Sequence, residues 1–457
     1  MHGYSLLEEA GRHSTAQRQQ ETSMDTRTPQ AQARQRRIVV ASTFIGATIE
    51  WYDFYIFGVI SALFLNKLFF PSFDSTTGTL LGFMTFATAW VVRPLGGIIA
   101  GHIGDRVGRK TTLLWSFIIM GAATTLIGLL PTYETAGIIG AVLLLLLRVI
   151  QGLSVGAEYG GAIVTVVEHA DKAKRGFFGS LPQCGSFLGL LLGNATFLAI
   201  INMDQSALMS WGWRIPFLLS ALMLGVGILI RTKVMESPDF QKAKDSGNIE
   251  GMPLATVVKQ HRRQLFAIMF AQAAPNTFFY ACAVAMVSYA VTKLGISQSK
   301  MLAAVCLGAF AEMCMIPLFG ALTDRISRRK VFVGGLLVMA FMAYPFFTAL
   351  EAKAYPWLLV CYVVMLGLGH AACHASQAAL FSEMFPTNVR YTGLSVGYQA
   401  SGAIFGGPLP IIATVLIAMH GGGIWLFYGY TMLIAFVSLV AIMAGRSYQK
   451  SLSQVPA

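Results

Sequence analysis

Residues 97–120 read GIIAGHIGDRVGRKTTLLWSFIIM. A short loop with three basic residues, Arg106, Arg109 and Lys110, separates two apolar stretches that continue beyond the quoted segment. Continuous apolar runs of about 18 residues indicate membrane-spanning helices, because membrane-spanning strands are about ten residues long and alternate apolar with polar side chains. The segment therefore predicts two helices that cross a bilayer and are joined by a basic loop.

The same pattern recurs in the second half of the chain. A shift of 219 residues aligns four loop positions: Gly101 with Gly320, Asp105 with Asp324, Arg106 with Arg325, and Lys110 with Arg329. A shift of 215 residues aligns three more: Gly152 with Gly367, Glu168 with Glu383, and Arg175 with Arg390. Because both halves have the same orientation, we expect a parallel repeat about an axis along the membrane normal, with a substrate cavity between the halves.

The composition extends this prediction to nearly the whole chain. Among the 457 residues 55% are hydrophobic and 12% are charged, against about 25% charged in soluble domains, which excludes an ordinary cytosolic enzyme. The predicted fold is an all-α membrane protein with twelve transmembrane helices in two six-helix halves. The spans lie near residues 38–65, 80–104, 111–130, 136–168, 176–201, 215–230, 264–291, 301–322, 331–350, 357–383, 392–419 and 424–444.

The distribution of Lys and Arg predicts the orientation. Of the 33 basic residues, 26 lie on the side that carries both termini, 5 on the other side and 2 within spans. Basic loops stay in the cytoplasm, so we expect both termini to be cytoplasmic. The predicted organisation is a disordered N-terminal tail (residues 1–37, with either Met1 or Met24 as the start), a first bundle (38–234), a cytoplasmic linker (235–263), a second bundle (264–445) and a C-terminal tail (446–457).

Several stretches resemble a known family. Residues 101–110 are similar to the loop motif of the major facilitator superfamily, and residues 320–329 repeat it with Ser327 in place of Gly108. More narrowly, five stretches resemble the metabolite:proton symporter family: Glu50-Trp51-Tyr52-Asp53-Phe54, Arg93-Pro94-Leu95-Gly96-Gly97, RVIQGLSVGAEYGG at residues 148–161, Trp213-Arg214-Ile215-Pro216-Phe217 and Glu236-Ser237-Pro238.

This resemblance covers about residues 36–445. It implies the major facilitator fold and proton-coupled solute transport in the cytoplasmic (inner) membrane of a bacterium. Family members carry proline and betaines, shikimate, 2-oxoglutarate, citrate or aromatic acids. The resemblance therefore indicates the mode of transport more firmly than the solute.

The repeated loops predict a conformational latch at the cytoplasmic face. An acid after a span can interact with the positive N-terminal end of a neighbouring helix, while basic residues pair with acids at other span ends. The alternative is a simple turn with basic anchors, but the recurrence in both halves favours the latch. The expected latch residues are Gly101, Asp105, Arg106, Arg109, Glu168, Arg175, Asp324, Arg325, Arg328, Glu383 and Arg390.

Two arginines, Arg93 and Arg148, lie at membrane depth. An arginine at the bilayer centre costs about 2.5–3.5 kcal/mol, so each should face a partner or a watery cavity. The acids in neighbouring spans are Asp53, Glu50 and Glu158. If all five groups were ionised, the cluster would carry one negative charge, so we expect one acid to bind the coupled proton, with Asp53 preferred, then Glu50 and Glu158. The alternative is a set of static ion pairs.

The substrate site is expected between the halves. A guanidinium can bind a carboxylate through two hydrogen bonds, so Arg93 and Arg148 favour an organic acid. The alternative is that Arg93 serves only the coupling network and does not bind the solute. His370 and His374 share a helical face and suit substrate contact, proton transfer or packing better than metal binding, because the HExxH form is absent. The other expected cavity residues are Tyr52, Tyr159, Gln183, Asn276, Tyr280 and Gln399. Glu312 is an acid in the eighth span without an obvious partner.

These observations predict a secondary transporter that imports a small organic acid with protons by alternating access. The alternatives are a proton symporter for a zwitterion such as proline or betaine, a proton-coupled exporter, and a membrane sensor without transport activity. Neither a phosphate-binding Gly-x-x-x-x-Gly-Lys motif nor a catalytic triad motif occurs, so we do not expect an enzyme. The expected partners are a carboxylate solute, protons and the lipid bilayer, with no cofactor, metal or nucleic acid, and the expected state is a monomer.

Overall fold

The computed structural model describes residues 29–232 and 253–445, apart from 108, 157, 159–161, 164–165, 168–169, 171, 201 and 387–388. These residues form helices joined by turns, with no strand among them. Ten described helical segments are long and apolar enough to cross a membrane, and a shorter apolar helix covers Leu114–Gly128. Together with the long helix α2 (Pro29–Leu63), they correspond to the twelve predicted spans. The predicted fold class is confirmed.

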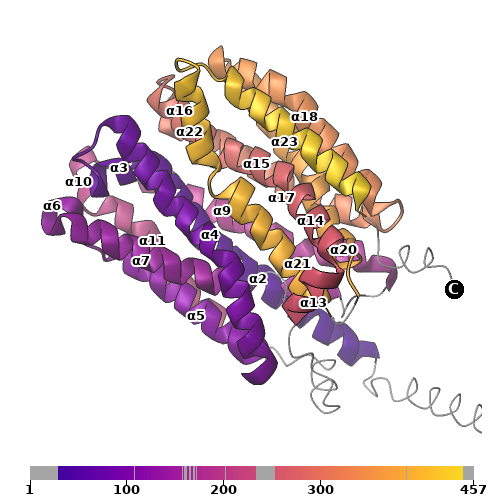
Figure 1. Ribbon diagram of the computed structural model, residues 1–457. Helices are drawn as coiled ribbons and strands as arrows, with labels where there is room; N and C mark the ends of the chain where they lie inside the picture. The colour runs from indigo at the N-terminus through magenta and orange to yellow at the C-terminus, as the bar shows by residue number, and fades with distance from the viewer. Residues whose placement is uncertain are drawn as a thin grey trace, which may run out of the picture.

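The N-terminal half forms the indigo-to-magenta bundle in Figure 1. Besides α2, it contains the helical elements α3 (Leu65–Phe69), α4 (Ser75–Val107), α5 (Arg109–Gly128), α6 (Tyr133–Ala136), α7 (Ile138–Val155), η1 (Lys172–Lys174), α9 (Arg175–Ile200), α10 (Gln205–Ser210), η2 (Gly212–Arg214) and α11 (Ile215–Arg231).

The C-terminal half forms the adjoining red-to-yellow bundle. It contains α13 (Pro253–Gln260), α14 (Arg262–Ala271), α15 (Ala273–Tyr280), η3 (Ala281–Ala285), α16 (Met286–Thr292), α17 (Gln298–Thr323), α18 (Arg328–Glu351), α19 (Tyr355–Tyr362), η4 (Val363–His370), α20 (Ala371–Ser382), α21 (Arg390–Ser401), η5 (Gly402–Gly406), α22 (Leu409–Met419) and α23 (Trp425–Ala444).

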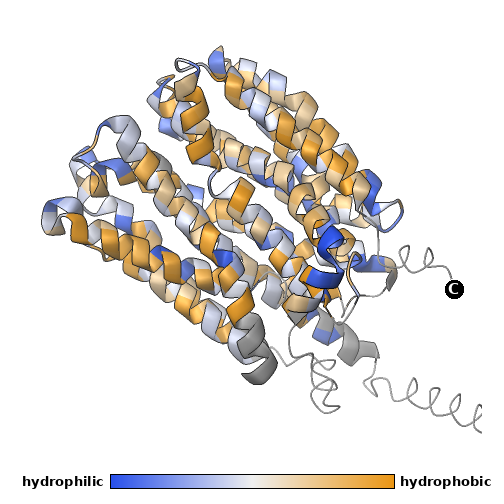
Figure 2. Cartoon of the chain, viewed as in Figure 1, coloured by the Kyte–Doolittle hydropathy of each residue, from blue (hydrophilic) through white to orange (hydrophobic). Residues whose placement is uncertain are grey.

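The outer surface of the bundle carries large apolar side chains. Phe341, Leu222 and Trp115 have 76%, 70% and 60% of their surface exposed, and Figure 2 shows hydrophobic residues along the lengths of the helices, with hydrophilic segments such as α13 near the ends. Apolar surface on this scale is not stable in water, and it fits the hydrocarbon layer of a bilayer.

Two helix boundaries differ from the prediction. The predicted N-terminal tail extends to residue 37, but α2 begins at Pro29, because Pro is favourable at a first helical position and the following Gln, Ala and Arg residues are good helix formers. The predicted linker 235–263 contains the short helix α13, and α14 starts within it at Arg262. The linker prediction therefore missed a helical segment.

Three predicted spans of the C-terminal half are interrupted by π-helical segments. These are η3, η4 and η5. Insertions of this kind widen the helix by one residue and recur at functional sites. At the start of η5, a Cβ atom on Gly402 would lie 2.4 Å from the ring of Trp90, so glycine allows α4 to approach this segment closely.

The two halves meet along two seams. In one, α9 contacts α17 and α20, and in the other α4 contacts α21, η5 and α22. We call the end of the bundle that carries the start of α9 and the turn at residues 324–327 the linker face, because α13 lies there (Figure 1). We call the end that carries α3, α6 and α10 the opposite face.

Candidate functional site

A central cavity lies between the two halves. Helices α2 and α9 line it from the N-terminal half, and α15, η4, α20 and α21 line it from the C-terminal half. Its residues are Trp51, Tyr55, Ser186, Phe187, Gln272, Asn276, Phe279, Tyr280, His370, His374 and Tyr398. The free space amounts to about 280 Å³, but only about 10 Å³ admits the centre of a water molecule, so solute binding requires the walls to move apart.

Four predicted substrate residues line this cavity: Asn276, Tyr280, His370 and His374. The aromatic wall, which includes Tyr55, Phe187 and Phe279, was missed. In the sequence, an aromatic residue within an apolar span cannot be told from an ordinary core residue. Of the aromatic residues in this wall, only Trp51 belongs to one of the motifs quoted above.

The cavity contains unsatisfied polar groups. The buried atoms Ser186 Oγ, Gln272 Oε1, Tyr280 Oη and His374 Nε2 have no hydrogen-bond partner among the described residues. Buried polar atoms are normally paired, so such a set marks a place where another molecule supplies partners. Two hydroxyls and an imidazole can donate hydrogen bonds to a carboxylate or hydroxyl group of a solute.

Arg93 lies behind the aromatic wall and does not line the cavity. Its guanidinium carbon is 3.7 Å from the ring centroid of Trp90 and 4.1 Å from that of Phe54. Buried Nε and Nη2 have no hydrogen-bond partner in the described part of the chain. Trp51, whose ring centroid is 5.7 Å away, contacts both Arg93 and the cavity. The charge of Glu50 acts on Arg93, which agrees with a predicted pairing of an arginine with an acid of the first span.

The position of Arg148 differs from the prediction of a cavity-facing cation. It donates hydrogen bonds to the backbone carbonyls of Thr85 and Phe86, at 3.4 Å and 3.0 Å, and to the side chain of Gln151. Gln151 donates in turn to Thr124 Oγ1 at 2.8 Å. Carbonyl oxygens therefore satisfy this buried cation, and it ties α7 to α4 within the N-terminal half.

Asp53 is fully buried and lies on the side of α2 that packs against α11. Its Oδ1 accepts a hydrogen bond of 2.6 Å from the Ser220 hydroxyl, and its Oδ2 has no partner among the described residues. It also interacts with Thr124 and with the charge of Glu50. Asp53 is thus linked to Arg148 only indirectly, through Thr124 and Gln151, and the two do not form one ion-paired cluster.

Four other predicted site residues are buried but do not line the cavity. The Tyr52 hydroxyl donates to the carbonyl of Pro216 at 2.8 Å and so faces α11. Gln399 lies on α21 beside the lining residue Tyr398 and its Oε1 has no partner among described atoms. Gln183 lies on α9, and Glu158 follows α7.

Glu312 has a partner that sequence spacing could not reveal. Its Oε1 contacts Nδ1 of His370 in a buried ion pair or hydrogen bond. The two residues are 58 positions apart, on α17 and η4. The sequence showed no obvious partner for Glu312, and the structure provides one in His370.

At the linker face a carboxylate joins the halves. Asp324 accepts hydrogen bonds from the backbone N–H groups of Gly176 at 2.7 Å and Phe177 at 3.0 Å. These are the first free N–H groups of α9, so the acid lies against the positive end of a helix from the other half. The predicted type of latch contact is present at Asp324.

Close backbone approach reinforces this contact. A Cβ atom on Gly176 would lie 2.1 Å from Thr323 Oγ1, and one on Gly320 would lie 2.3 Å from Ser180 Oγ. Both distances are too short for real atoms, so glycine is required wherever α9 and α17 stay this close. The linker face is closed along this seam.

Other predicted latch residues surround it. Arg328 forms an ion pair with Glu383, while Arg390 Nε donates to the carbonyl of Phe385 at 3.4 Å. Arg175 Nε is buried without a partner among described atoms, and the charges of Arg175 and Asp324 act on Arg328. Arg325 is exposed next to Asp324.

For the loop of the first half, residues 101–110, the structure describes the helices but not the side chains of the predicted latch residues. Gly101, Asp105 and Arg106 belong to the last turns of α4, and Arg109 begins α5. Their side chains, together with Tyr159 and Glu168, lie outside what the structure describes.

The opposite face carries a wider cleft. It encloses about 1020 Å³, of which about 350 Å³ admits the centre of a water molecule. Polar side chains contribute to its walls: Ser75, Thr76, Thr79, Ser288, Tyr289, Thr292, Lys293 and Thr414.

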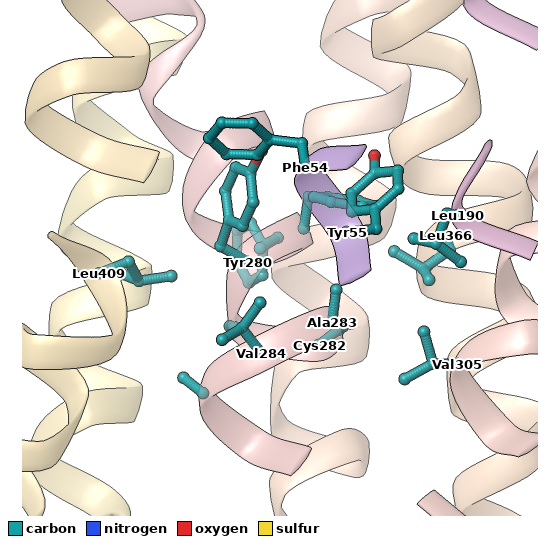
Figure 3. Close-up of a cluster of buried hydrophobic side chains, with 14 of the residues drawn as sticks. Phe54, Tyr55, Leu190, Tyr280, Cys282, Ala283, Val284, Val305, Leu366 and Leu409 are labelled. Carbon is teal, nitrogen blue, oxygen red and sulfur yellow. The ribbon is translucent and has the colours of Figure 1, made fainter. Parts of the chain in front are cut away.

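A layer of apolar side chains separates the cleft from the cavity. Along α15–α16, Tyr280 lines the cavity and Ser288 lines the cleft, with Val284 between them. Figure 3 shows Val284 beside Tyr280, with Phe54 and Leu409 from two other helices nearby. The bundle is therefore tightly joined at the linker face and hollowed from the opposite face.

Comparison with protein families agrees with this architecture. Residues 39–251 match the family of sugar (and other) transporters, and residues 273–457 match the Major Facilitator Superfamily. The two matched regions correspond to the two helical halves.

Curated relatives extend over most of the chain. The shikimate transporter of Escherichia coli K12 is 36% identical, covering 85% of this chain and 90% of the relative. The inner membrane metabolite transport protein YhjE of the same organism is 35% identical over 92% of this chain and 97% of the relative. The proline/betaine transporter of Salmonella typhimurium is 31% identical over 88% of this chain and 82% of the relative.

Solved structures share the fold. The xylose transporter XylE of E. coli, in a partially occluded inward open conformation, has a TM-score of 0.70 at 17% identity and covers 92% of this chain and 98% of its own. A D-xylose-proton symporter has a TM-score of 0.67 at 18% identity, with coverage of 89% and 96%.

Two linked six-helix bundles that enclose a cavity define a secondary transporter, a multi-pass membrane protein that is not an enzyme. The chain belongs to the major facilitator superfamily, in its metabolite:proton symporter family.

Proposed function

We propose that this protein imports a small organic acid together with protons by alternating access. The observation that carries the proposal is the set of unpaired polar atoms on Ser186, Tyr280 and His374 in the central cavity. These groups donate hydrogen bonds to an anionic oxygen. No carboxylate occurs among the described residues that line the cavity, whereas an amino group would need one. The similarity to a shikimate transporter supports the same solute class.

A zwitterion such as betaine is the second candidate solute. Six of the eleven lining residues are aromatic: Trp51, Tyr55, Phe187, Phe279, Tyr280 and Tyr398. Aromatic faces attract quaternary ammonium groups, which require no acid. The similarity to proline/betaine transporters supports this alternative.

The transport cycle we propose alternates between the two faces. In the state described, Asp324 and the glycine contact of α9 with α17 hold the linker face closed. Solute enters the cleft, passes the apolar layer at Val284, and binds as the cavity walls move apart to admit it. The opposite face then closes and the Asp324 contact breaks, which opens the cavity toward the linker face.

Arg93 and Asp53 have separate roles in this proposal. Opening at Trp51 brings the unsatisfied N–H groups of Arg93 to the solute carboxylate. Asp53 binds a coupled proton, because a fully buried carboxyl with one unpaired oxygen is favoured in its neutral form. The charge of Glu50 acts on both Arg93 and Asp53.

We place the linker face in the cytoplasm of a bacterial cell, since the basic residues gather there, and we propose that one chain suffices for transport. The cavity is built from side chains of a single chain.

A ligand panel tests the solute class. The purified full-length chain is heated with shikimate, 2-oxoglutarate, citrate, proline or glycine betaine, and its unfolding temperature is measured. A ligand at a hundred times its Kd adds about 2.7 kcal/mol of stability. We expect stabilisation by one of the acids, and loss of that stabilisation in Tyr280→Phe. Stabilisation by proline or betaine alone would replace the organic acid with the zwitterion.

Uptake into proteoliposomes with an imposed inward proton gradient tests coupling. We expect accumulation of the stabilising solute above its outside concentration. Equilibration without accumulation would reject proton symport.

A further inference from the structure

The C-terminal half holds a buried acid and imidazole in direct contact. Glu312 Oε1 meets His370 Nδ1, and the residues are 0% and 3% exposed. The second carboxyl oxygen of Glu312, Oε2, has no hydrogen-bond partner among the described atoms. The ring of His370 also interacts with the backbone of Pro275, whose only polar backbone atom besides its substituted nitrogen is the carbonyl oxygen.

The surroundings of this pair contain no described cation that would stabilise an anion. The titratable side chains that interact electrostatically with Glu312 are of types that never carry a positive charge: Tyr55 on α2, Cys184 on α9, Cys282 on η3 and Cys373 on α20. The ring of His374 stacks on His370 with centroids 5.1 Å apart. An isolated carboxylate is costly in such a site, so the pair favours the binding of one proton, either on the carboxyl or on the imidazole.

The pair also reaches the solute cavity. His370 lines the cavity, and Glu312 lies behind it on α17. His374 lines the same wall with Nε2 unpaired, and the ring of Phe279 lies 5.2 Å from that of His370. A proton released from the pair therefore has the cavity as its exit.

We propose that Glu312 and His370 form a proton-binding site of the C-terminal half, distinct from Asp53, that takes up one proton when solute binds and releases it when solute leaves. An O–H bond of a hydronium ion in the cavity breaks as an O–H bond on Glu312 or an N–H bond on His370 forms, leaving water, and the reverse transfer returns the proton to water as hydronium. An anionic solute beside His370 favours the protonated pair, and by linkage the protonated pair favours the anion. The role in coupling rests on the proposed function, whereas the existence of the proton site does not.

Infrared spectroscopy tests the site without any solute. The full-length chain in lipid is stepped from acid to alkaline pH, and the absorption of protonated carboxyl C=O groups is followed. We expect Glu312→Gln to remove part of the pH-dependent absorption, and Asp53→Asn to remove a different part. Glu134→Gln, which changes an exposed carboxyl, serves as the control. A pH-dependent band unchanged by Glu312→Gln would overturn the proposal.

A second variant keeps the test decisive if Glu312→Gln does not fold. His370→Asn removes the imidazole but leaves the acid, so the pH at which the C=O absorption of Glu312 changes must shift. An unmoved band in His370→Asn also overturns the proposal.

Transport of shikimate by proteoliposomes tests the coupling. Under a gradient of one pH unit, loss of one coupled proton lowers the maximum accumulation about tenfold. We expect this loss in Glu312→Gln, with exchange of internal for external shikimate retained. Full accumulation in the variant contradicts the coupling role. Absence of shikimate transport by the unmodified chain argues against the proposed solute, and the infrared result stands independently of it.

Discussion

The carboxylate of Asp324 accepts a hydrogen bond of 2.7 Å from the backbone N–H of Gly176, and this bond connects the two halves. The donor belongs to the first turn of α9 and the acceptor follows the last turn of α17. A charge at a helix N-terminus contributes about 0.3–1 kcal/mol. A contact of this size can close a face without preventing its opening.

Replacing Asp324 by Asn should loosen the start of α9. The amide can keep one hydrogen bond but loses the charge, so the amides of Gly176 and Phe177 should exchange their hydrogens about two- to fivefold faster, as about 0.3–1 kcal/mol implies. Hydrogen exchange followed by mass spectrometry measures this. Asp204→Asn, which alters the capping residue of α10, is the matched control and should leave α9 unchanged. Equal protection of α9 in Asp324→Asn would reject the latch.

Replacing Gly176 by Val should hold the linker face open. Even a Cβ atom would lie 2.1 Å from Thr323 Oγ1, so α9 and α17 must separate and cyclic transport should stop. Spin labels at Lys174 and Lys330, both exposed, should report a longer distance. Gly334→Ala is the control, because a Cβ there meets nothing within 4 Å. An unchanged spin-label distance in Gly176→Val would show that the contact does not control closure.

Arg93→Lys should impair uptake more than folding. The guanidinium stacks on Trp90 and Phe54 at 3.7 Å and 4.1 Å, and an ammonium lacks both the plane and the paired donors. We expect at least a tenfold rise in KM for the solute with normal membrane insertion. A normal KM in Arg93→Lys would remove Arg93 from the substrate site.

Arg148→Lys should instead lower stability. Lysine cannot bond simultaneously to the carbonyls of Thr85 and Phe86 and to Gln151, as Arg148 does. Each hydrogen bond to a charged group contributes about 1.5–3 kcal/mol, so the unfolding temperature should fall clearly. If Arg148→Lys raises KM without any loss of stability, Arg148 acts on the solute after all.

Asp53→Asn should lower the maximum accumulation about tenfold under a gradient of one pH unit, because one coupled proton is lost, but should retain exchange. The amide cannot bind and release a proton, although it can still accept the hydrogen bond that Ser220 donates at 2.6 Å. Ser220→Ala, which keeps the carboxyl, should retain accumulation and serves as the control. If Asp53→Asn vesicles concentrate solute as strongly as vesicles with the unmodified chain under the same pH gradient, the proton assignment moves to Glu50 and Glu158.

Labelling in intact cells checks the orientation. Single cysteines replace Ser72, which is exposed on the loop before α4, and Ser246 in the linker. An impermeant reagent should label position 72 and not 246, because the basic side of the chain faces the cytoplasm. The reverse pattern would invert the orientation.

The long apolar runs and the repeated basic loops were enough to predict the helices, their number and the fold family. Such runs leave few choices, because every backbone group within a bilayer must be paired inside the helix. The recurrence of Asp105 at Asp324 in the two repeated loops also indicated a latch. The π-helical segments were not predictable, since their altered hydrogen bonding depends on how neighbouring helices pack.

The direction in which each buried charge points was decided by tertiary structure. Arg148 and Arg93 look alike in sequence and both lie over aromatic rings, yet carbonyl oxygens satisfy the first, whereas Nε and Nη2 of the second have no hydrogen-bond partner among the described residues. Likewise Glu312 and His370 meet only because α17 and η4 pack side by side. Hydropathy and charge act along the chain and can be read from it, whereas the partner of a buried polar group is whichever atom packing brings within about 3 Å.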